Sequence, residues 1–301
     1  MSVTRLPRNK RSDTPPPMQV TDRDLRILRW VAAYRYMTRE QVESLEFTPS
    51  TRSYCKRRLM LLFQNAYLDR HFLPLRSAFG AARPYYTLDS RGANLVAEAF
   101  GLRRAEVDWR PRDGRREPLY MEHALRINDV RVIVTLAARS AALELEWVDE
   151  RELKRRAPGH RVRDPLHDGQ QITIVPDGYF ILGGQWPFAL ELDRGTVEEV
   201  PFKRKVRGYG EWKVTGAYER SFGTPRLRVL FVVTDARRDA NRLKRIRVWT
   251  EAAKGSNLFW FAALDDLRSD SVLYKPRWQV ARRDGVHALL QGTTRGLGDA
   301  R

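Results

Sequence analysis

Apolar side chains recur at helical spacing through the first part of the chain. The segment that opens with Thr21 places Leu25, Leu28 and Val31 three or four positions apart, which is typical of a helix with one buried face. Thr21 and Thr38 each stand where a helix N-cap is expected, with Asp24 and Gln41 three residues further on. The pattern therefore predicts three helices, at 21–38, 38–47 and 51–66. Two strands, at 67–76 and 83–89, and a closing helix at 90–100 follow.

Three helices followed by a hairpin describe a winged helix-turn-helix, whose third helix enters the major groove of DNA. The face of this helix opposite its apolar positions is basic, and the hairpin that would form the wing also carries arginines. A small helical domain that binds protein instead of DNA is the alternative. The candidate DNA-binding residues are Arg52, Ser53, Lys56 and Arg57 on the third helix and Arg70, Arg76 and Arg83 on the wing.

The second part of the chain alternates between the apolar spacing typical of helices and that typical of strands. A long amphipathic helix is predicted first, then three strands, a helix, a strand, a helix and a strand, which suits a mixed sheet flanked by helices. With the helical first part, the whole chain is predicted to be α+β. These elements are expected at 119–141, 142–150, 171–182, 187–195, 198–222, 226–235, 236–255 and 258–267.

Composition shifts divide the chain into five parts. The start is basic and rich in proline, and the segment after the closing helix of the first part has charge, proline and glycine without a sustained period. The predicted parts are a disordered basic arm at 1–20, a winged-helix domain at 21–101, a linker at 102–117, a second domain at 118–270 and a basic tail at 271–301.

Charge points to the kind of partner. The chain has 55 Lys and Arg against 37 Asp and Glu, a formal net charge of +18 and a sequence pI of about 10.5. Such a surface attracts polyanions by neutralising phosphates and releasing counterions, so double-stranded DNA is the expected partner. An Arg-rich soluble protein with no such partner is the other interpretation.

Several classes of protein are disfavoured by the sequence. The chain has one cysteine, Cys55, which excludes an internal disulfide framework and a cysteine-based zinc site. No apolar run approaches the roughly 18 residues that a membrane span needs, and the basic start lacks the apolar stretch of a signal peptide. No Gly-rich phosphate loop precedes a helix. We therefore expect a cytoplasmic protein with no membrane contact and no nucleotide cofactor.

Three carboxylates follow apolar runs in the second domain. Asp177 ends one run, and Glu191 and Asp193 end the next, two residues apart and so on one face of the predicted strand. Mg²⁺ prefers hard oxygen ligands, usually one or two carboxylates together with water and phosphate. The three acids are candidate metal ligands, for Mg²⁺ or Mn²⁺. The alternative is a salt-bridge network with neighbouring basic residues such as Arg194, Lys203 or Lys205.

The second domain resembles the PD-(D/E)XK nuclease superfamily. Pro176-Asp177 corresponds to the first element of its motif and Glu191 to the second, whereas the expected Lys two residues later is Asp193. Some members of the superfamily carry that Lys on the following helix, where this chain has Lys203 and Lys205. The resemblance implies a restriction-endonuclease-like fold with Asp177, Glu191, Asp193 and Lys205 as catalytic residues. It also implies Glu122, on the first helix of the domain, as a further ligand.

The whole chain resembles a narrower family, the replication-relaxation proteins of plasmids and other mobile elements. This resemblance implies a DNA-binding role in replication and DNA relaxation. Two alternatives stay open, namely a metal-dependent endonuclease that nicks or cleaves DNA, and a non-catalytic regulator of replication or transcription with a degenerate second domain. Pairing of two chains into a homodimer is also left open. The strings that carry the resemblance are TDRDLRILRWVAAYRYMTREQV, RRLMLLFQNAYLDR, YYTLDSRG, EHALRINDV, PDGYF, ELDRGT, the pair Lys205 and Tyr209, and RVLFVVTDARR.

Overall fold

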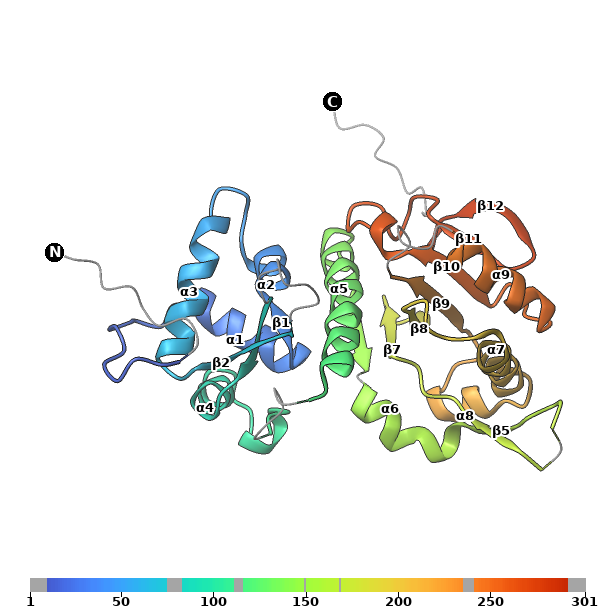
Figure 1. Ribbon diagram of the computed structural model, residues 1–301, viewed down its shortest axis with the longest axis horizontal. Helices are drawn as coiled ribbons and strands as arrows, with labels where there is room; N and C mark the ends of the chain where they lie inside the picture. The colour runs from blue at the N-terminus through green and yellow to red at the C-terminus, as the bar shows by residue number, and fades with distance from the viewer. Residues whose placement is uncertain are drawn as a thin grey trace. The chain divides into compact units, whose positions relative to one another are not determined.

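The computed structural model describes residues 10–74, 83–110, 116–148, 150–167, 169–234 and 241–291. The chain divides into two compact units, 1–132 and 133–301 (Figure 1). Each unit combines helices with strands, which confirms the predicted α+β class. Across the described ranges, no helix combines the length and the apolar character that a bilayer-spanning segment needs.

The first unit has three helices ahead of a small antiparallel sheet. Its strands lie in the order β1-β3-β2, so the hairpin of β2 and β3 is joined by the short strand that precedes α2. The elements are α1 (Asp22–Tyr34), β1 (Met37–Thr38), α2 (Arg39–Glu46), α3 (Arg52–Gln64), β2 (Leu68–Phe72), β3 (Pro84–Leu88), α4 (Ser90–Ala99) and the short 3-10 helix η1 (Arg104–Glu106).

The first two helices begin where their capping residues predict. Thr21 and Asp24 form a capping box in which the Thr21 N–H donates to Asp24 Oδ2 at 2.8 Å. Thr38 and Gln41 form a second one. Each box satisfies backbone N–H groups that a helix start otherwise leaves without an acceptor. Asp24 also binds Arg58 of α3, so the start of α1 is fixed to the third helix.

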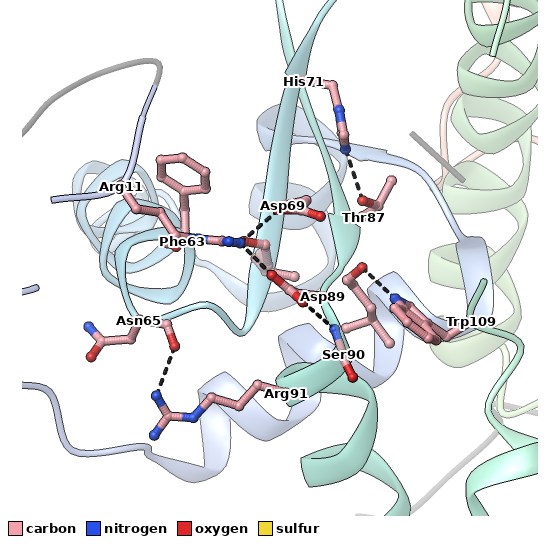
Figure 2. A network of polar contacts seen from close by, with 12 residues as sticks. Arg11, Phe63, Asn65, Asp69, His71, Thr87, Asp89, Ser90, Arg91 and Trp109 are labelled. Carbon is pink, nitrogen blue, oxygen red and sulfur yellow. Dashed lines mark hydrogen bonds and ion pairs between the residues drawn. The ribbon is translucent and has the colours of Figure 1, made fainter. Parts of the chain in front are cut away.

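Arg11 ties the segment before α1 to the body of the unit. Its guanidinium donates to the backbone carbonyl of Phe63, at the end of α3, at 2.9 Å. It also reaches the carboxylates of Asp69 on β2, at 2.7 Å, and Asp89 at the N-cap of α4, at 2.6 Å (Figure 2). Residues 10–20 of the arm that was expected to be disordered therefore lie against the helix and hairpin expected to bind DNA.

The first half of α5 (Pro118–Ser140) packs within the first unit. Met121 and Leu125 are buried in one cluster with Tyr36 and Tyr85. The Asn128 side-chain amide donates to the Tyr36 carbonyl at 2.6 Å. The boundary between the two compact units falls within this helix, further along the chain than the linker expected at 102–117.

The second unit is built on a seven-stranded mixed sheet in the order β12-β11-β10-β9-β8-β7-β4. The three strands β8, β9 and β10 are parallel, and the remaining neighbours are antiparallel. The strands are β4 (Leu145–Val148), β7 (Gly178–Leu182), β8 (Trp186–Asp193), β9 (Arg228–Val233), β10 (Phe259–Ala263), β11 (Trp278–Val280) and β12 (Arg283–His287).

Helices α7, α8 and α9 provide the core on one face of this sheet. Tyr179, Ala189 and Phe231 are buried there with Phe202 and Val206 of α7. Figure 1 shows α7 and α9 on this side of the sheet. The remaining elements of the unit are α6 (Glu150–Arg156), the 3-10 helix η2 (Ala157–His160), a separate two-stranded ribbon of β5 (Arg161–Arg163) and β6 (Gln171–Thr173), α7 (Glu199–Val214), α8 (Ala217–Phe222), α9 (Arg242–Ala252) and the 3-10 helix η3 (Leu264–Asp266).

The structure differs from the sequence-based expectation at two places in this unit. The strand expected at 171–182 is divided into β6 and β7, because Pro176 and Asp177 interrupt it. Residues 278–287, assigned to a basic tail, form β11 and β12 at the sheet edge. Trp278, which is only 1% exposed, anchors this edge. All but the last side chain of β12 are exposed, so the sequence lacks the alternation that signals a strand.

Candidate functional site

The exposed face of α3 carries the basic residues that the sequence singled out. Arg52, Ser53, Lys56 and Arg57 are all exposed. On the opposite face Cys55 and Leu59 are fully buried. Within the described part of the chain, Lys56 and Arg57 have no acidic partner, whereas Arg52 makes only a long contact with Glu43, at 3.9 Å. Most of the positive charge of this face is therefore directed to solvent.

The predicted wing residues differ among themselves. Arg70 is half-buried, with its guanidinium 4.5 Å from the Phe63 ring centre and one nitrogen 3.6 Å from the Met60 sulfur. It packs between α3 and the hairpin instead of reaching into solvent. Arg83 is exposed immediately before β3. Arg76 lies outside the described residues.

In the second unit, Asp177 immediately precedes β7, and Glu191 lies on the neighbouring strand β8. The Asp177 N–H donates to the Leu190 carbonyl at 3.0 Å, and its Oδ2 accepts from the Leu192 N–H at 2.8 Å. These two backbone bonds fix Asp177 beside the residues that flank Glu191. The two carboxylates are close enough for Asp177 to raise the pKa of Glu191.

Helix α7 supplies both partners of the Glu191 carboxylate. Lys205 Nζ donates to Oε2 at 2.6 Å, and the Tyr209 hydroxyl donates to Oε1 at 2.7 Å. The two residues stand four apart, so they share one face of the helix. Glu191 and Tyr209 are buried, whereas 46% of the Lys205 side chain is exposed. The ammonium group therefore lies between a buried acid and solvent.

The environment shifts the pKa of each of these groups. Burial raises the pKa of the Glu191 carboxyl, and Asp177 adds to that shift while Lys205 opposes it. Burial also disfavours the charged form of Lys205, yet the carboxylates of Glu191 and Asp177 outweigh this cost and raise the pKa of Lys205 above its usual value. Burial together with Glu191 raises the pKa of Tyr209, so its hydroxyl stays protonated and remains a hydrogen-bond donor.

Asp193 has a different partner from those that the sequence suggested. Both of its oxygens accept from Arg242, at 2.6 and 2.8 Å, and each side chain is only 4% exposed. Arg242 also donates to the Val197 carbonyl at 2.8 Å and lies over the Trp249 ring. This bidentate pair joins the end of β8 to the first turn of α9. The role of Asp193 as an added metal ligand stays a prediction that would require the pair to open.

Close packing of α7 sets the position of Lys205 and Tyr209. A Cβ at Gly208 would lie 2.6 Å from Ile174 Cδ1 and 2.8 Å from Ile172 Cγ2. Only glycine lets the helix approach β6 and the loop after it this closely. A Cβ at Gly178, next to Asp177, would similarly lie 2.7 Å from the Trp147 ring. Glycines thus bring both the helix and the Asp177 loop into place.

A model of the family described as replication-relaxation matches residues 28–227, more than half of the chain. The chain belongs to the replication-relaxation family. No curated protein and no solved structure matches it. The family suggests a role in the replication or relaxation of mobile elements. Asp177, Glu191, Lys205 and Tyr209 lie within the matched region, whereas Arg242 lies beyond it.

In this replication-relaxation protein, the remaining polar candidates are placed as follows. His160 is buried at the base of the β5–β6 ribbon, and Asp164 is buried at its tip. Arg204 binds Asp164 at 3.0 Å, and the His160 ring packs 4.8 Å from the Trp212 ring centre. Glu122 lies on α5, in the first unit. No group of three His, Cys, Asp or Glu side chains that could hold a metal ion occurs among the described residues.

Sequence reasoning did not find Arg242. The residue is separated from Asp193 by 49 positions and stands in a segment with several other basic residues. The only available signal was an unexplained acid, Asp193, at a position where the superfamily pattern has Lys. Lys203, which was considered beside Lys205, forms an ion pair with Glu199 on its own helix instead.

Proposed function

We propose that this chain binds duplex DNA through α3 and acts in the replication or relaxation of a plasmid or other mobile element. The observation that carries the proposal is the exposed basic face of α3. The order of α2, α3 and the β2–β3 hairpin is that of a winged helix-turn-helix, in which such a face enters the major groove. The net charge of +18 supports the same partner.

The roles of the α3 residues follow from their chemistry. Arg52 and Arg57 carry planar guanidinium groups, which can bind a guanine edge or a phosphate through two hydrogen bonds. Lys56 carries a point charge suited to a phosphate, and Ser53 is short enough to reach the DNA backbone. Tyr54, which is 58% exposed, lies among them as a further contact. Arg83 extends the basic surface onto the hairpin.

The experiment is a binding titration of the full chain with duplex DNA. Changing Arg52, Lys56 and Arg57 to Glu is expected to lower the affinity by roughly a hundredfold or more, because attraction to phosphate becomes repulsion. The matched control reverses three exposed arginines on other elements of the unit, Arg29, Arg103 and Arg126. If both variants lose the same affinity, the effect is one of net charge and the assignment of α3 is wrong.

The second unit supports a second candidate function, cleavage of a phosphodiester. Asp177 just before β7, Glu191 on the adjacent strand β8 and Lys205 on the next helix are the arrangement expected for a PD-(D/E)XK-like domain. Two carboxylates together with water and phosphate suit Mg²⁺ or Mn²⁺, so Asp177 and Glu191 fit such an ion. Asp193 does not fit while Arg242 occupies both of its oxygens.

In such a site the residues of the chain would have distinct tasks. Asp177 and Glu191 would hold the ion, which when bound polarises the phosphate and activates water. Lys205 is half-exposed, so its ammonium can bind a phosphate oxygen once Glu191 turns to the metal. The buried hydroxyl of Tyr209 would stay hydrogen-bonded to Glu191 Oε1 and so limit how far that carboxylate can rotate.

Charge pairing of Glu191 and Asp193 with basic residues favours the non-catalytic alternative. Lys205 neutralises Glu191, and Arg242 neutralises Asp193, so both acids are already balanced by cations of the chain. A unit of this kind can hold DNA or a second copy of the chain without cutting. In this case the protein is a regulator of replication or transcription, with pairing into a homodimer as one use of the unit.

Supercoiled plasmid DNA distinguishes these two functions. Conversion to open-circle or linear form in the presence of Mg²⁺ or Mn²⁺, with loss of that conversion in an Asp177→Ala, Glu191→Ala variant, supports cleavage. Glu199→Ala is the control, since Glu199 is an acid of the same unit that pairs with Lys203. Plasmid that stays supercoiled with either metal, under conditions where the chain binds it, supports the regulator.

A further inference from the structure

The β5–β6 ribbon presents one polar face and one apolar face. Val162 and Ile172 are paired in the middle of the ribbon and buried in the core beside α7. The other face carries two cross-strand pairs, Arg161 opposite Thr173 and Arg163 opposite Gln171, and all four side chains are exposed. Within the described part of the chain, neither arginine has an acidic partner. Figure 1 shows β5 at the margin of the unit, near α8.

The tip of the ribbon is held by polar contacts around the buried Asp164. The Asp164 N–H donates to the Gln170 carbonyl at 2.9 Å, and Asp164 Oδ1 accepts from the Leu166 N–H at 3.1 Å. Arg204 on α7 donates to Asp164 Oδ2 at 3.0 Å and to the Gln171 carbonyl at 3.1 Å. These hydrogen bonds from Asp164 and Arg204 fix the position of the polar face of the ribbon.

Helix α7 connects the ribbon with the carboxylates of Asp177 and Glu191. Arg204 binds the ribbon, and the next residue, Lys205, binds Glu191. A ligand that lies along the ribbon is thus held in a defined register with the candidate phosphodiester site. The four side chains of the polar face, two guanidinium groups, an amide and a hydroxyl, are of the kinds that contact base edges and phosphates in DNA.

We propose that the β5–β6 ribbon is a second DNA-contacting element, whose face of Arg161, Arg163, Gln171 and Thr173 binds in the major groove of duplex DNA. The B-form major groove, about 12 Å wide, admits a two-stranded ribbon. Residues two apart on a strand are separated by about 6.7 Å, which matches two steps of roughly 3.4 Å along DNA. The deep and narrow major groove of duplex RNA does not admit side chains in this way. The inference rests on the proposed function, since it requires that the chain bind DNA.

The test compares salt-dependent DNA binding of full-length variants. Arg161→Ala, Arg163→Ala is expected to lower affinity by about tenfold or more. It should also reduce the slope of log affinity against log salt by about 1.8, the value for two phosphate contacts. The matched control is Lys275→Ala, Arg277→Ala, because these residues are also exposed, two apart and in the second unit. Hydroxyl-radical footprints should show a protected stretch that disappears in the ribbon variant and persists in the control.

The outcomes distinguish failure of the ribbon inference from failure of the proposed function. If reversal of the α3 charges weakens binding while the ribbon variant matches its control in affinity, slope and footprint, the ribbon inference is overturned and the proposed function stands. If the unaltered chain does not bind duplex DNA, both fail. If the ribbon variant loses duplex RNA binding to the same extent as duplex DNA binding, the groove assignment is wrong.

Discussion

On α3, Lys56 and Arg57 present their charges to solvent, whereas in the second unit Glu191 and Asp193 have theirs neutralised by Lys205 and Arg242. Solvated cations can bind a polyanion at once, with counterion release as the driving force. Buried acids that are already paired must first exchange one cation for another. Under the proposed function, the first unit would bind DNA without a rearrangement, whereas the second unit would act on it only after one.

The largest effect on stability is expected from breaking the pair of Asp193 and Arg242. Arg242→Ala leaves a buried carboxylate without its partner, which typically costs about 3–5 kcal/mol of unfolding free energy. Chemical denaturation measures the loss. Replacing both residues, Asp193→Asn with Arg242→Met, should cost less, because no lone charge remains.

Arg247→Ala is the matched control for this prediction. Arg247 lies on the same helix and pairs with Glu251 four residues on, with both side chains partly exposed. Such a pair contributes about 1 kcal/mol or less. Equal losses in the two variants would show that the buried pair is no more important than a surface one.

A smaller effect is expected from Tyr209→Phe. The change removes the hydroxyl that donates to Glu191 Oε1 and leaves a buried acceptor unsatisfied, at a cost of about 1–3 kcal/mol. Burial already raises the pKa of Glu191, and loss of the hydroxyl raises it further. A carboxyl whose pKa is higher in the folded chain than in the unfolded chain destabilises the folded state as the pH rises above the pKa of the unfolded chain. The loss should therefore be larger at pH 7 than near pH 5.

Tyr179→Phe serves as the control for that measurement. The Tyr179 hydroxyl is also buried, but its partner is the neutral hydroxyl of Tyr218, at 3.0 Å. Its loss should cost a similar free energy at both pH values. Should the effect of Tyr209→Phe not depend on pH, Glu191 would not be the buried acid with a raised pKa.

The smallest effect concerns His160, a buried group whose charged form the nearby Arg156 disfavours. Its Nδ1 lies 3.0 Å from the Ile174 carbonyl, and burial lowers the pKa of the ring. As the pH falls, the unfolded chain binds the proton first, near the usual His pKa of about 6.5. The free energy of unfolding should therefore be greatest above that pH and decrease below it. His160→Phe should flatten this decrease in unfolding free energy between pH 7 and pH 5.5.

Local signals explain how much of the structure could be predicted. The capping boxes of Thr21 with Asp24 and of Thr38 with Gln41 lie within one helical turn, so the sequence placed both helix starts. The four-residue spacing of Lys205 and Tyr209 likewise put both on one face of α7. For the same reason, the exposed residues of α3 could be predicted, because its apolar positions recur at helical spacing and so mark the opposite, buried face.

Contacts between distant segments could not be predicted in this way. Arg11 binds residues more than 50 positions away, and its basic, proline-rich surroundings are typical of a solvated arm. Arg242 is one of several arginines in its segment, and no spacing distinguishes it. The strand β12 lies at the sheet edge with its side chains exposed, so its sequence has no buried alternation to read. In each case the deciding partner is supplied only by the folded chain.

Helix α5 has a practical consequence for dissecting the molecule. Met121 and Leu125 complete the first core, so a fragment that stops at residue 117 would leave the aromatic rings of Tyr36 and Tyr85 bare to water. A fragment that starts at 118 would carry those same apolar side chains with nothing to cover them. Protein engineers who wish to produce either half should therefore design the break within the helix, around residue 132, and expect to repair the newly cut end with polar substitutions.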